Sequence, residues 1–102
     1  MSTILEEHVA ELADLFRLLG DTTRMRIVFR CLKEPVSVGD IAISLEISQS
    51  LASHHLRLLR AARVVTADRQ GKQVFYFASD QHISRMLSDM LEHIEEPDQE
   101  ID

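Results

Sequence analysis

The sequence predicts a mainly α-helical (α+β) fold, a winged helix-turn-helix, in a single domain of 102 residues. Three observations carry this prediction. Apolar residues recur at helical spacing in five segments. The third and fourth of these segments are short, and a tight connection at residues 47–48 joins them. The period then becomes that of β-strands over residues 64–78, as expected for the hairpin, or wing, that follows the two helices.

The first two segments are predicted to be helices with one apolar face each. Residues 4–19 form the first helix, which Gly20 ends. Residues 22–33 form the second, for which Asp21 is placed to act as N-cap and which stops before Pro35. Their apolar residues are Leu5, Val9, Leu12, Phe16 and Leu19 in the first helix and Met25, Ile27, Val28, Cys31 and Leu32 in the second.

The helix-turn-helix is predicted over about residues 37–62. Ser37, with an acidic residue three positions later, has the spacing of a capping box that opens a short helix over 38–46. Ser48 is placed to cap the next helix, over 49–62. The residues of this helix that are expected to face the core are Leu51, Leu56 and Leu59.

The wing is predicted over about residues 64–78 as two β-strands. Residues 64–67 and 73–78 are rich in β-branched and aromatic side chains. Residues 68–72 between them carry Gly71 and are expected to form the turn.

The last segment, residues 79–97, is predicted to be an amphipathic helix with metal-binding residue types at both ends. Asp80 and His82 lie near its start and His93 and Glu96 near its finish, and all four types bind divalent cations such as zinc. The histidines are eleven residues apart, which is ~16 Å along a helix axis and too far for one coordination shell. The apolar stripe between these ends consists of Ile83, Met86, Leu87, Met90, Leu91 and Ile94.

Eleven residues return to within ~20° of the same azimuth on a helix, so both ends face one way. A second copy, antiparallel across a two-fold axis, would place the first donor pair of one chain beside the second pair of the other, twice. We therefore expect two intersubunit metal sites. Glu95 is an alternative to Glu96, because the residue before Pro97 is pushed out of helical geometry.

Charge is distributed unevenly along this chain, whose net charge is -6. Residues 1–20 carry one Arg against four acidic residues, residues 21–78 nine basic against five acidic, and residues 79–102 one Arg against eight acidic. The basic middle predicts a module that binds a polyanion. No run approaches the ~18–20 apolar residues of a membrane span, and no signal-peptide pattern is present. One cysteine, Cys31, excludes an internal disulfide, so a cytoplasmic location is expected.

The segment from Ser37 to Phe77 resembles the DNA-binding region of the ArsR/SmtB family of bacterial metal-responsive repressors, and the likeness extends over about residues 10–97. The segments LGDTTRMRIV, HHLRLLRAARVV and DRQGKQVFY resemble the second helix, the recognition helix with its exit, and the wing of that family. The D-x-H and H-x-x-E pairs of the last helix are similar to the zinc-sensing site of part of the family.

The resemblance implies a homodimer through the first and last helices, with the helix after Ser48 in the major groove of DNA. Its implied contacts to bases or phosphates are Gln49, Ser50, Ser53, His54 and Arg57, and those of the wing tip to phosphate or the minor groove are Arg69, Gln70 and Lys72. His55, adjacent to the outward-facing His54, is expected to be packed within the fold.

The resemblance also narrows the choice of metal that the site is expected to bind. Relatives that sense arsenic, cadmium or lead carry cysteines where this chain has Ser37 and Gly39, so the soft thiolate site is absent. Two histidines and two carboxylates suit tetrahedral zinc, with cobalt as a ready surrogate. Nickel would need further ligands, from His8 or the N-terminus, although His8 is expected to be only exposed. Cys31 is expected to be a small core residue.

The function expected from these features is that of a repressor. The metal-free homodimer would bind a pseudo-palindromic operator, and zinc at the last-helix sites would release it. Two alternatives stay open at this point, a nickel or cobalt sensor of the same fold and a metal-independent dimeric DNA-binding regulator. A zinc enzyme is disfavoured, because four protein ligands close the coordination sphere and no nucleophile or base accompanies them.

Overall fold

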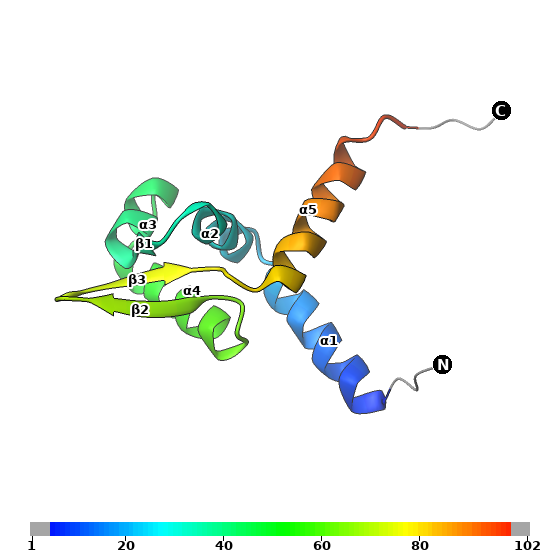
Figure 1. Cartoon of the computed structure of the whole chain (residues 1–102), viewed down its shortest axis with the longest axis horizontal. Helices are drawn as coiled ribbons and strands as arrows, with labels where there is room; N and C mark the ends of the chain where they lie inside the picture. Colours follow the sequence, from blue (N-terminus) through cyan, green and yellow to red (C-terminus); the bar gives the residue numbers. More distant parts are fainter. Residues whose placement is uncertain (1–4, 99–102) are drawn as a thin grey trace.

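A computed structural model of the chain describes residues 5–98. The elements of this part are five helices and a small antiparallel sheet: α1 (Glu6–Leu19), α2 (Thr22–Lys33), β1 (Val36–Ser37), α3 (Val38–Leu45), α4 (Gln49–Ala61), β2 (Thr66–Gln70), β3 (Gln73–Phe77) and α5 (Gln81–Glu95). The winged helix-turn-helix predicted from the sequence is confirmed. The hairpin projects at one end of the molecule, and α1 and α5 diverge at the other (Figure 1). None of the helices within residues 5–98 has the length and apolar character needed to cross a bilayer.

Short polar side chains begin the three central helices, as predicted. Asp21, Ser37 and Ser48 each accept a hydrogen bond from the backbone N–H three residues further on, at 2.9, 3.2 and 3.0 Å respectively. Each bond satisfies one N–H of a first helical turn, so these residues set where α2, α3 and α4 begin. The expected first residue of α1, at position 4, lies outside the described residues.

The core lies where α2, α3 and α4 meet the sheet and the start of α5. Its largest fully buried side chains are Leu19, Ile27, Val28, Cys31, Val36, Ile41, Leu56, Leu59 and Val64. The expectation that Leu51 faces this core is wrong, because its side chain is 40% exposed. The buried face of α4 is formed by Ala52, His55, Leu56 and Leu59, and at ~100° per residue Leu51 lies about 90° from its centre.

The first strand of the wing lies further along the chain than predicted, whereas the second, predicted at residues 73–78, is β3 (Gln73–Phe77). Strand β2 starts at Thr66, because Arg63 turns the chain out of α4 with φ 61° and Val64 and Val65 enter the core. The N–H of Val64 donates to the carbonyl of Leu59 at 2.9 Å, so Val64 closes the end of α4 instead of pairing in the sheet.

The hairpin turn is also tighter than predicted. Gln70 pairs with Gln73, which leaves Gly71 and Lys72 as the turn, and Gly71 has the positive φ of 66° that a two-residue hairpin requires. A third strand, β1, was not expected. Val36 and Ser37 pair with β3, so the sheet order is β1-β3-β2 and the wing is anchored to the start of α3.

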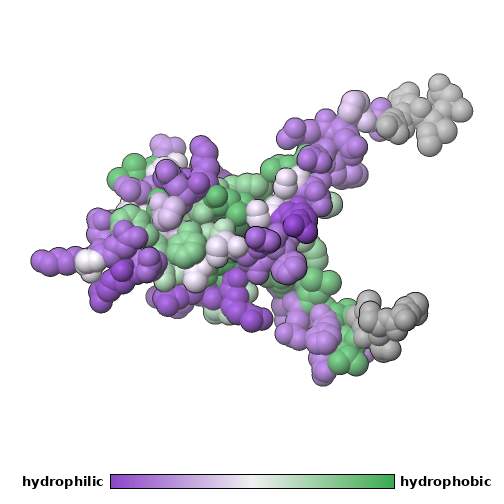
Figure 2. Space-filling model, viewed as in Figure 1, coloured by the Kyte–Doolittle hydropathy of each residue, from purple (hydrophilic) through white to green (hydrophobic). Residues whose placement is uncertain are grey.

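Helices α1 and α5 leave much of their apolar stripes uncovered within one chain. On α1, Leu19 is buried, but Leu5, Val9, Leu12 and Phe16 are each about half exposed. The outer half of α5 exposes Met90, Leu91 and Ile94, the last to 75%. Hydrophobic side chains gather along α1 in Figure 2, whereas hydrophilic ones cover the hairpin tip. Such contiguous apolar surface is typical of a protein interface.

Candidate DNA-binding and metal-binding residues

Helix α4 presents a polar face to solvent. Its buried residues lie on one side, and the five residues that were expected to contact DNA lie outside that buried face and are all exposed: Gln49, Ser50, Ser53, His54 and Arg57. The outward position of His54 and the buried position of His55 are both as predicted. Helix α4 therefore has an exposed surface rich in hydrogen-bond donors and acceptors.

Gln49 lies against the first turn of α3. A Cβ atom built on Gly39 would come within 3.3 Å of Nε2 of Gln49, a tight contact. The amide of Gln49 therefore lies close to the backbone of Gly39, between the two helices of the helix-turn-helix. The sequence pointed to Gln49 but not to this role of Gly39, because residues ten apart on different helices share no spacing signal.

His55 connects α4 to the start of α2. Its Nδ1 lies 3.4 Å from Nη1 of Arg24, whose Nε donates to the carbonyl of Leu18 at 2.7 Å. Burial lowers the pKa of His55, and the positive charge of Arg24 acts in the same direction, although Asp21 opposes them. The backbone N–H of Arg24 lowers the pKa of Asp21. His55 is thus a packing residue held in its neutral form, and sequence reasoning did not identify Arg24 as its partner.

The wing tip carries the other expected DNA contacts. Arg69 and Gln70 end β2, Lys72 lies in the turn, and all three are exposed. Figure 1 shows the tip of the hairpin as the part of the molecule furthest from α1 and α5. A cationic tip at this distance from the body is suited to contacts with phosphate groups.

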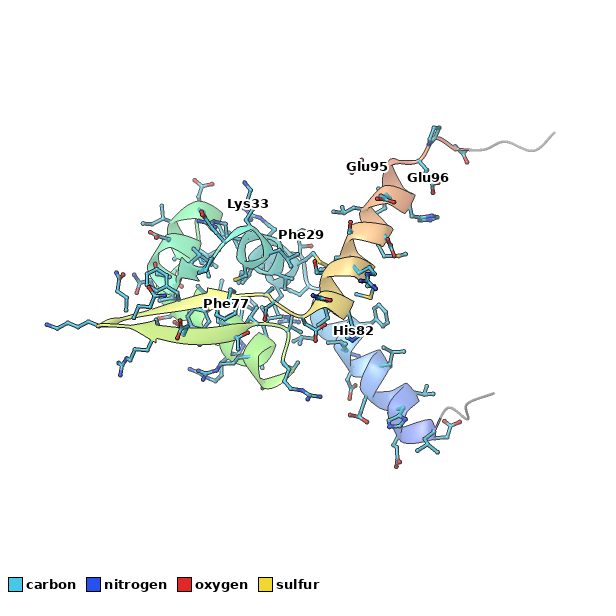
Figure 3. The ribbon with its side chains drawn as sticks, viewed as in Figure 1. Phe29, Lys33, Phe77, His82, Glu95 and Glu96 are labelled. Atoms are coloured by element: carbon cyan, nitrogen blue, oxygen red, sulfur yellow. The ribbon has the colours of Figure 1, made fainter. Side chains whose placement is uncertain are left out.

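The four expected metal ligands lie on α5 in two separated pairs. Asp80 is the N-cap of α5 and accepts the N–H of Ile83 at 3.0 Å, and His82 is exposed in the first turn. At the other end, Nδ1 of His93 lies 3.8 Å from Oε1 of Glu96. Figure 3 shows His82 at the base of α5 and Glu96 at its far end. Within residues 5–98, no three His, Cys, Asp or Glu side chains of one chain come together as a metal site.

Glu95 and Glu96, at the C-terminal end of α5, differ in backbone conformation and in position. Glu95 is the last helical residue, whereas Glu96 has extended backbone with ψ 139° and lies next to His93. Figure 3 places the two carboxylates on different sides of the helix end. His93, Glu96 and Asp98 line a shallow hollow there, and His82 lines another with Arg85 and Asp89, two residues that were not expected near the site.

Cys31 is buried in α2, as expected of a core residue. Burial raises the pKa of its thiol to about 11. The thiol is therefore protonated at neutral pH and is a poor metal ligand and nucleophile. Ser37 and Gly39, at the start of α3, provide no thiolate.

Comparison with known proteins agrees with this architecture. Residues 21–67 match the model of a family described as "Bacterial regulatory protein, arsR family". The chain is 30% identical over 92 residues to the transcriptional repressor SmtB homolog of Synechocystis, covering 90% of this chain and 70% of the relative. It is 34% identical over 80 residues to the transcriptional repressor SmtB of Mycobacterium tuberculosis, covering 78% of this chain but only 59% of that longer protein.

Solved structures share the fold. The cadmium metal-sensor CMTR of Mycobacterium tuberculosis is 33% identical, with a TM-score of 0.67 over 88% of this chain and 94% of that one. A homodimeric winged helix-turn-helix DNA-binding domain from Mycobacterium bovis, 19% identical, has a TM-score of 0.77 over 100% of this chain and 99% of that one.

Proposed function

The chain belongs to the ArsR family of bacterial transcriptional regulators, and from this we propose that it is a zinc-responsive repressor that acts as a homodimer. The family is that of ArsR/SmtB-type metal-responsive repressors, and the chain is a regulator and not an enzyme. In our proposal the metal-free dimer binds operator DNA and dissociates from it when zinc binds between the two α5 helices.

One observation carries this proposal. Two donor pairs lie at opposite ends of α5. The outer part of the apolar stripe between them, Met90, Leu91 and Ile94, stays exposed among the described residues of one chain. An antiparallel α5 from a second chain would cover Met90, Leu91 and Ile94 and bring complementary donors to both ends. The same contact thus supplies an interface and completes two sites. The exposed stripe of α1 supports an interface that includes both helices.

The chemistry of the donors supports zinc. Asp80 and His82 of one chain and His93 and Glu96 of the other would hold it with two imidazoles and two carboxylates. The contact between His93 and Glu96 favours Glu96 over Glu95 as the fourth ligand. Cobalt fits the same tetrahedral set, and nickel would need donors from outside it, such as His8 or the N-terminus, which lies outside the described residues. Bound zinc would supply a rigid bridge between subunits.

On the DNA side, the proposed contacts divide by position. Gln49, Ser50, Ser53, His54 and Arg57 on the exposed surface of α4 would meet base edges and nearby phosphates. Arg69, Gln70 and Lys72 at the wing tip would meet phosphates or the minor groove, and would contribute affinity and salt dependence more than sequence choice. Two such surfaces, one from each chain, would fit two successive major grooves.

The proposed regulation follows from linkage between the two sites. The donors of α5 set the angle between the two α5 helices when they are brought together, and that angle sets the spacing of the two α4 helices. If the zinc-bound spacing fits DNA poorly, zinc lowers DNA affinity and DNA lowers zinc affinity by the same factor. Coupling free energies of this kind are typically ~1–3 kcal/mol.

Mixed dimers test the intersubunit arrangement. A His82→Gln chain and a His93→Gln chain each form homodimers in which both sites lack one histidine. The mixed dimer of the two has one site without histidines and one site with both. We expect isothermal titration calorimetry to detect no tight zinc in either homodimer and one tight zinc per mixed dimer.

Three other outcomes would count against parts of the proposal. Absence of tight zinc in the mixed dimer, with two per wild-type dimer, would contradict the intersubunit assignment. Absence of tight zinc, cobalt and nickel in the wild-type dimer would favour a metal-independent regulator. Tighter nickel than zinc binding, with release of operator DNA by nickel alone, would favour the nickel sensor.

A further inference from the structure

Helix α2 carries an unusual concentration of positive charge. Its twelve residues include Arg24, Arg26, Arg30 and Lys33 and no acidic residue. Arg26, Arg30 and Lys33 are spaced four and three residues apart, so they lie along one side of the helix and repel one another. Like charges at these spacings destabilise a helix, which makes their clustering informative.

These three cations line a groove between α2 and α3. Phe29 lies between them on α2, and Ser44 and Leu45 of α3 form the opposite wall. Phe29 is half-buried and Leu45 is buried, so the groove has an apolar floor with a cationic rim. Lys33 points from α2 to the side of the molecule away from the hairpin (Figure 3).

Arg30 is the least exposed of the three cations on the rim. Its side chain is 27% exposed, and its Nη1 atom is buried without a hydrogen-bond acceptor among the described residues. The nearest carboxylate oxygen, Oε1 of Glu34, is 3.8 Å away, beyond hydrogen-bonding distance, and Glu34 is exposed. A guanidinium that is largely buried beside a distant carboxylate has few partners in the chain, and an oxyanion in the groove could pair with the part of the Arg30 side chain that stays exposed.

We propose that this groove is a binding site for a small organic anion, with a carboxylate or phosphate group on an apolar or aromatic body. The anionic group contacts Arg30, with Arg26 and Lys33 beside it, and the apolar body packs on Phe29 and Leu45. This site is separate from the proposed metal ligands on α5. It is also separate from the proposed DNA surface, because no residue of α4 or of the hairpin lines the groove.

The test uses benzoate and phenyl phosphate as probes, with benzamide as the neutral analogue of benzoate. Each is titrated into the metal-free full-length protein and followed by amide NMR shifts. We expect both anions, but not benzamide, to shift the amides of Phe29 and Ser44. Inorganic phosphate should bind at least about tenfold more weakly than phenyl phosphate, because it lacks the apolar body.

Two variants and one control locate the site. Arg30→Gln removes the least exposed of the three charges, and Lys33→Gln removes an exposed one whose loss does not endanger folding. We expect the first to weaken binding of both anions by ~10-fold or more, and the second by a smaller factor. Arg69→Gln at the wing tip removes the same kind of charge outside the groove and should leave anion binding unchanged.

The proposal is overturned if neither anion shifts the groove amides, or if all three variants weaken binding equally, which would indicate non-specific charge attraction. It is also overturned if Arg30→Gln lowers affinity for DNA and its salt dependence while leaving anion binding unaltered, since the groove would then contact the DNA backbone. None of these results bears on zinc binding by α5, so the two proposals fail independently.

Discussion

At the scale of single residues, three polar side chains decide where the central helices begin. Asp21, Ser37 and Ser48 each use one oxygen to accept the N–H three residues on. Ser48 has the greatest functional consequence, because it sets the first turn of α4 and with it the positions of Gln49 and Ser50. Loss of the cap should therefore affect both the stability of α4 and the placement of the adjacent proposed DNA contacts.

Replacing Ser48 by Ala should lower the free energy of unfolding by ~1 kcal/mol, since one N–H of α4 loses its acceptor. Urea denaturation of the metal-free protein measures this change. Ser53→Ala is the matched control, because Ser53 is exposed inside the same helix. The control should leave stability within about 0.5 kcal/mol. Equal losses in both variants would contradict the capping role.

His55 should make stability depend on pH. Its pKa is lowered in the folded protein, chiefly by burial, so the unfolded chain binds the proton more readily. Stability is then fully present above the unfolded pKa of ~6.5 and falls as pH drops toward the lower folded pKa. Denaturation at pH 7.5 and 5.5 in the presence of a chelator measures this loss, and His55→Gln should show a smaller one. A variant with the same pH dependence as wild type would exclude His55 as its source.

At the scale of elements, α1 and α5 differ from the three helices between them. The central helices bury their apolar faces within the chain, but the outer parts of α1 and α5 do not. Intrinsic helix propensity alone gives a short helix little stability, so α1 and α5 need further packing of their apolar faces. Their stripes are the surfaces on which our proposed dimer depends.

Leu12→Asp should dissociate the dimer. Leu12 is 54% exposed in the single chain, and a charge there would be buried in the proposed interface. Loss of the burial of the Leu12 side chain in the interface would alone raise the dissociation constant of the dimer at least ~10-fold. Sedimentation equilibrium measures the constant, and Ile43→Asp on α3, at a position 77% exposed, is the control that should leave it unchanged. A monomeric wild-type protein, or equal effects at both sites, would contradict the assigned interface.

The wing should contribute salt-dependent affinity. Replacing Arg69 and Lys72 by Gln should lower DNA affinity and reduce the slope of log affinity against log salt by ~0.9 for each phosphate that is no longer neutralised. Affinity for a selected operator and for an unrelated duplex should fall by similar factors, which fluorescence anisotropy at several salt concentrations can measure. A decrease confined to the operator would instead indicate that the wing reads sequence.

At the scale of the whole molecule, sequence patterns predicted the elements better than their boundaries. Helical periodicity and the capping residues located all five helices, because both are local signals. The start of β2 was misplaced because Val64 and Val65 have the composition of a strand, but tertiary packing draws them into the core. Strand β1 was missed because two residues carry no periodic signal and only their long-range partner, β3, makes them a strand.

The candidate sites divide in the same way. The candidate DNA contacts on α4 and the candidate metal ligands on α5 could be identified from residue types and their spacing in the sequence. All of these candidate side chains are exposed in the structure. The contacts of Gln49 with Gly39 and of His55 with Arg24 could not, because each joins two helices whose relative placement no sequence spacing encodes. Whether the two donor pairs of α5 meet depends on a second chain, which the mixed-dimer experiment addresses.

The rate at which the buried thiol of Cys31 is alkylated can report how often the core opens. Cys31 is the one thiol in 102 residues, it is 2% exposed, and its carbonyl accepts the N–H of Ala78 at 3.1 Å, between the wing and α5. A thiol-alkylating reagent can therefore react only when the core opens, and its rate reports the population of opened molecules. Partners that bind only the closed form should slow alkylation in proportion to their occupancy. The mass shift on alkylation would therefore report dimer assembly, zinc binding and DNA binding without any other label.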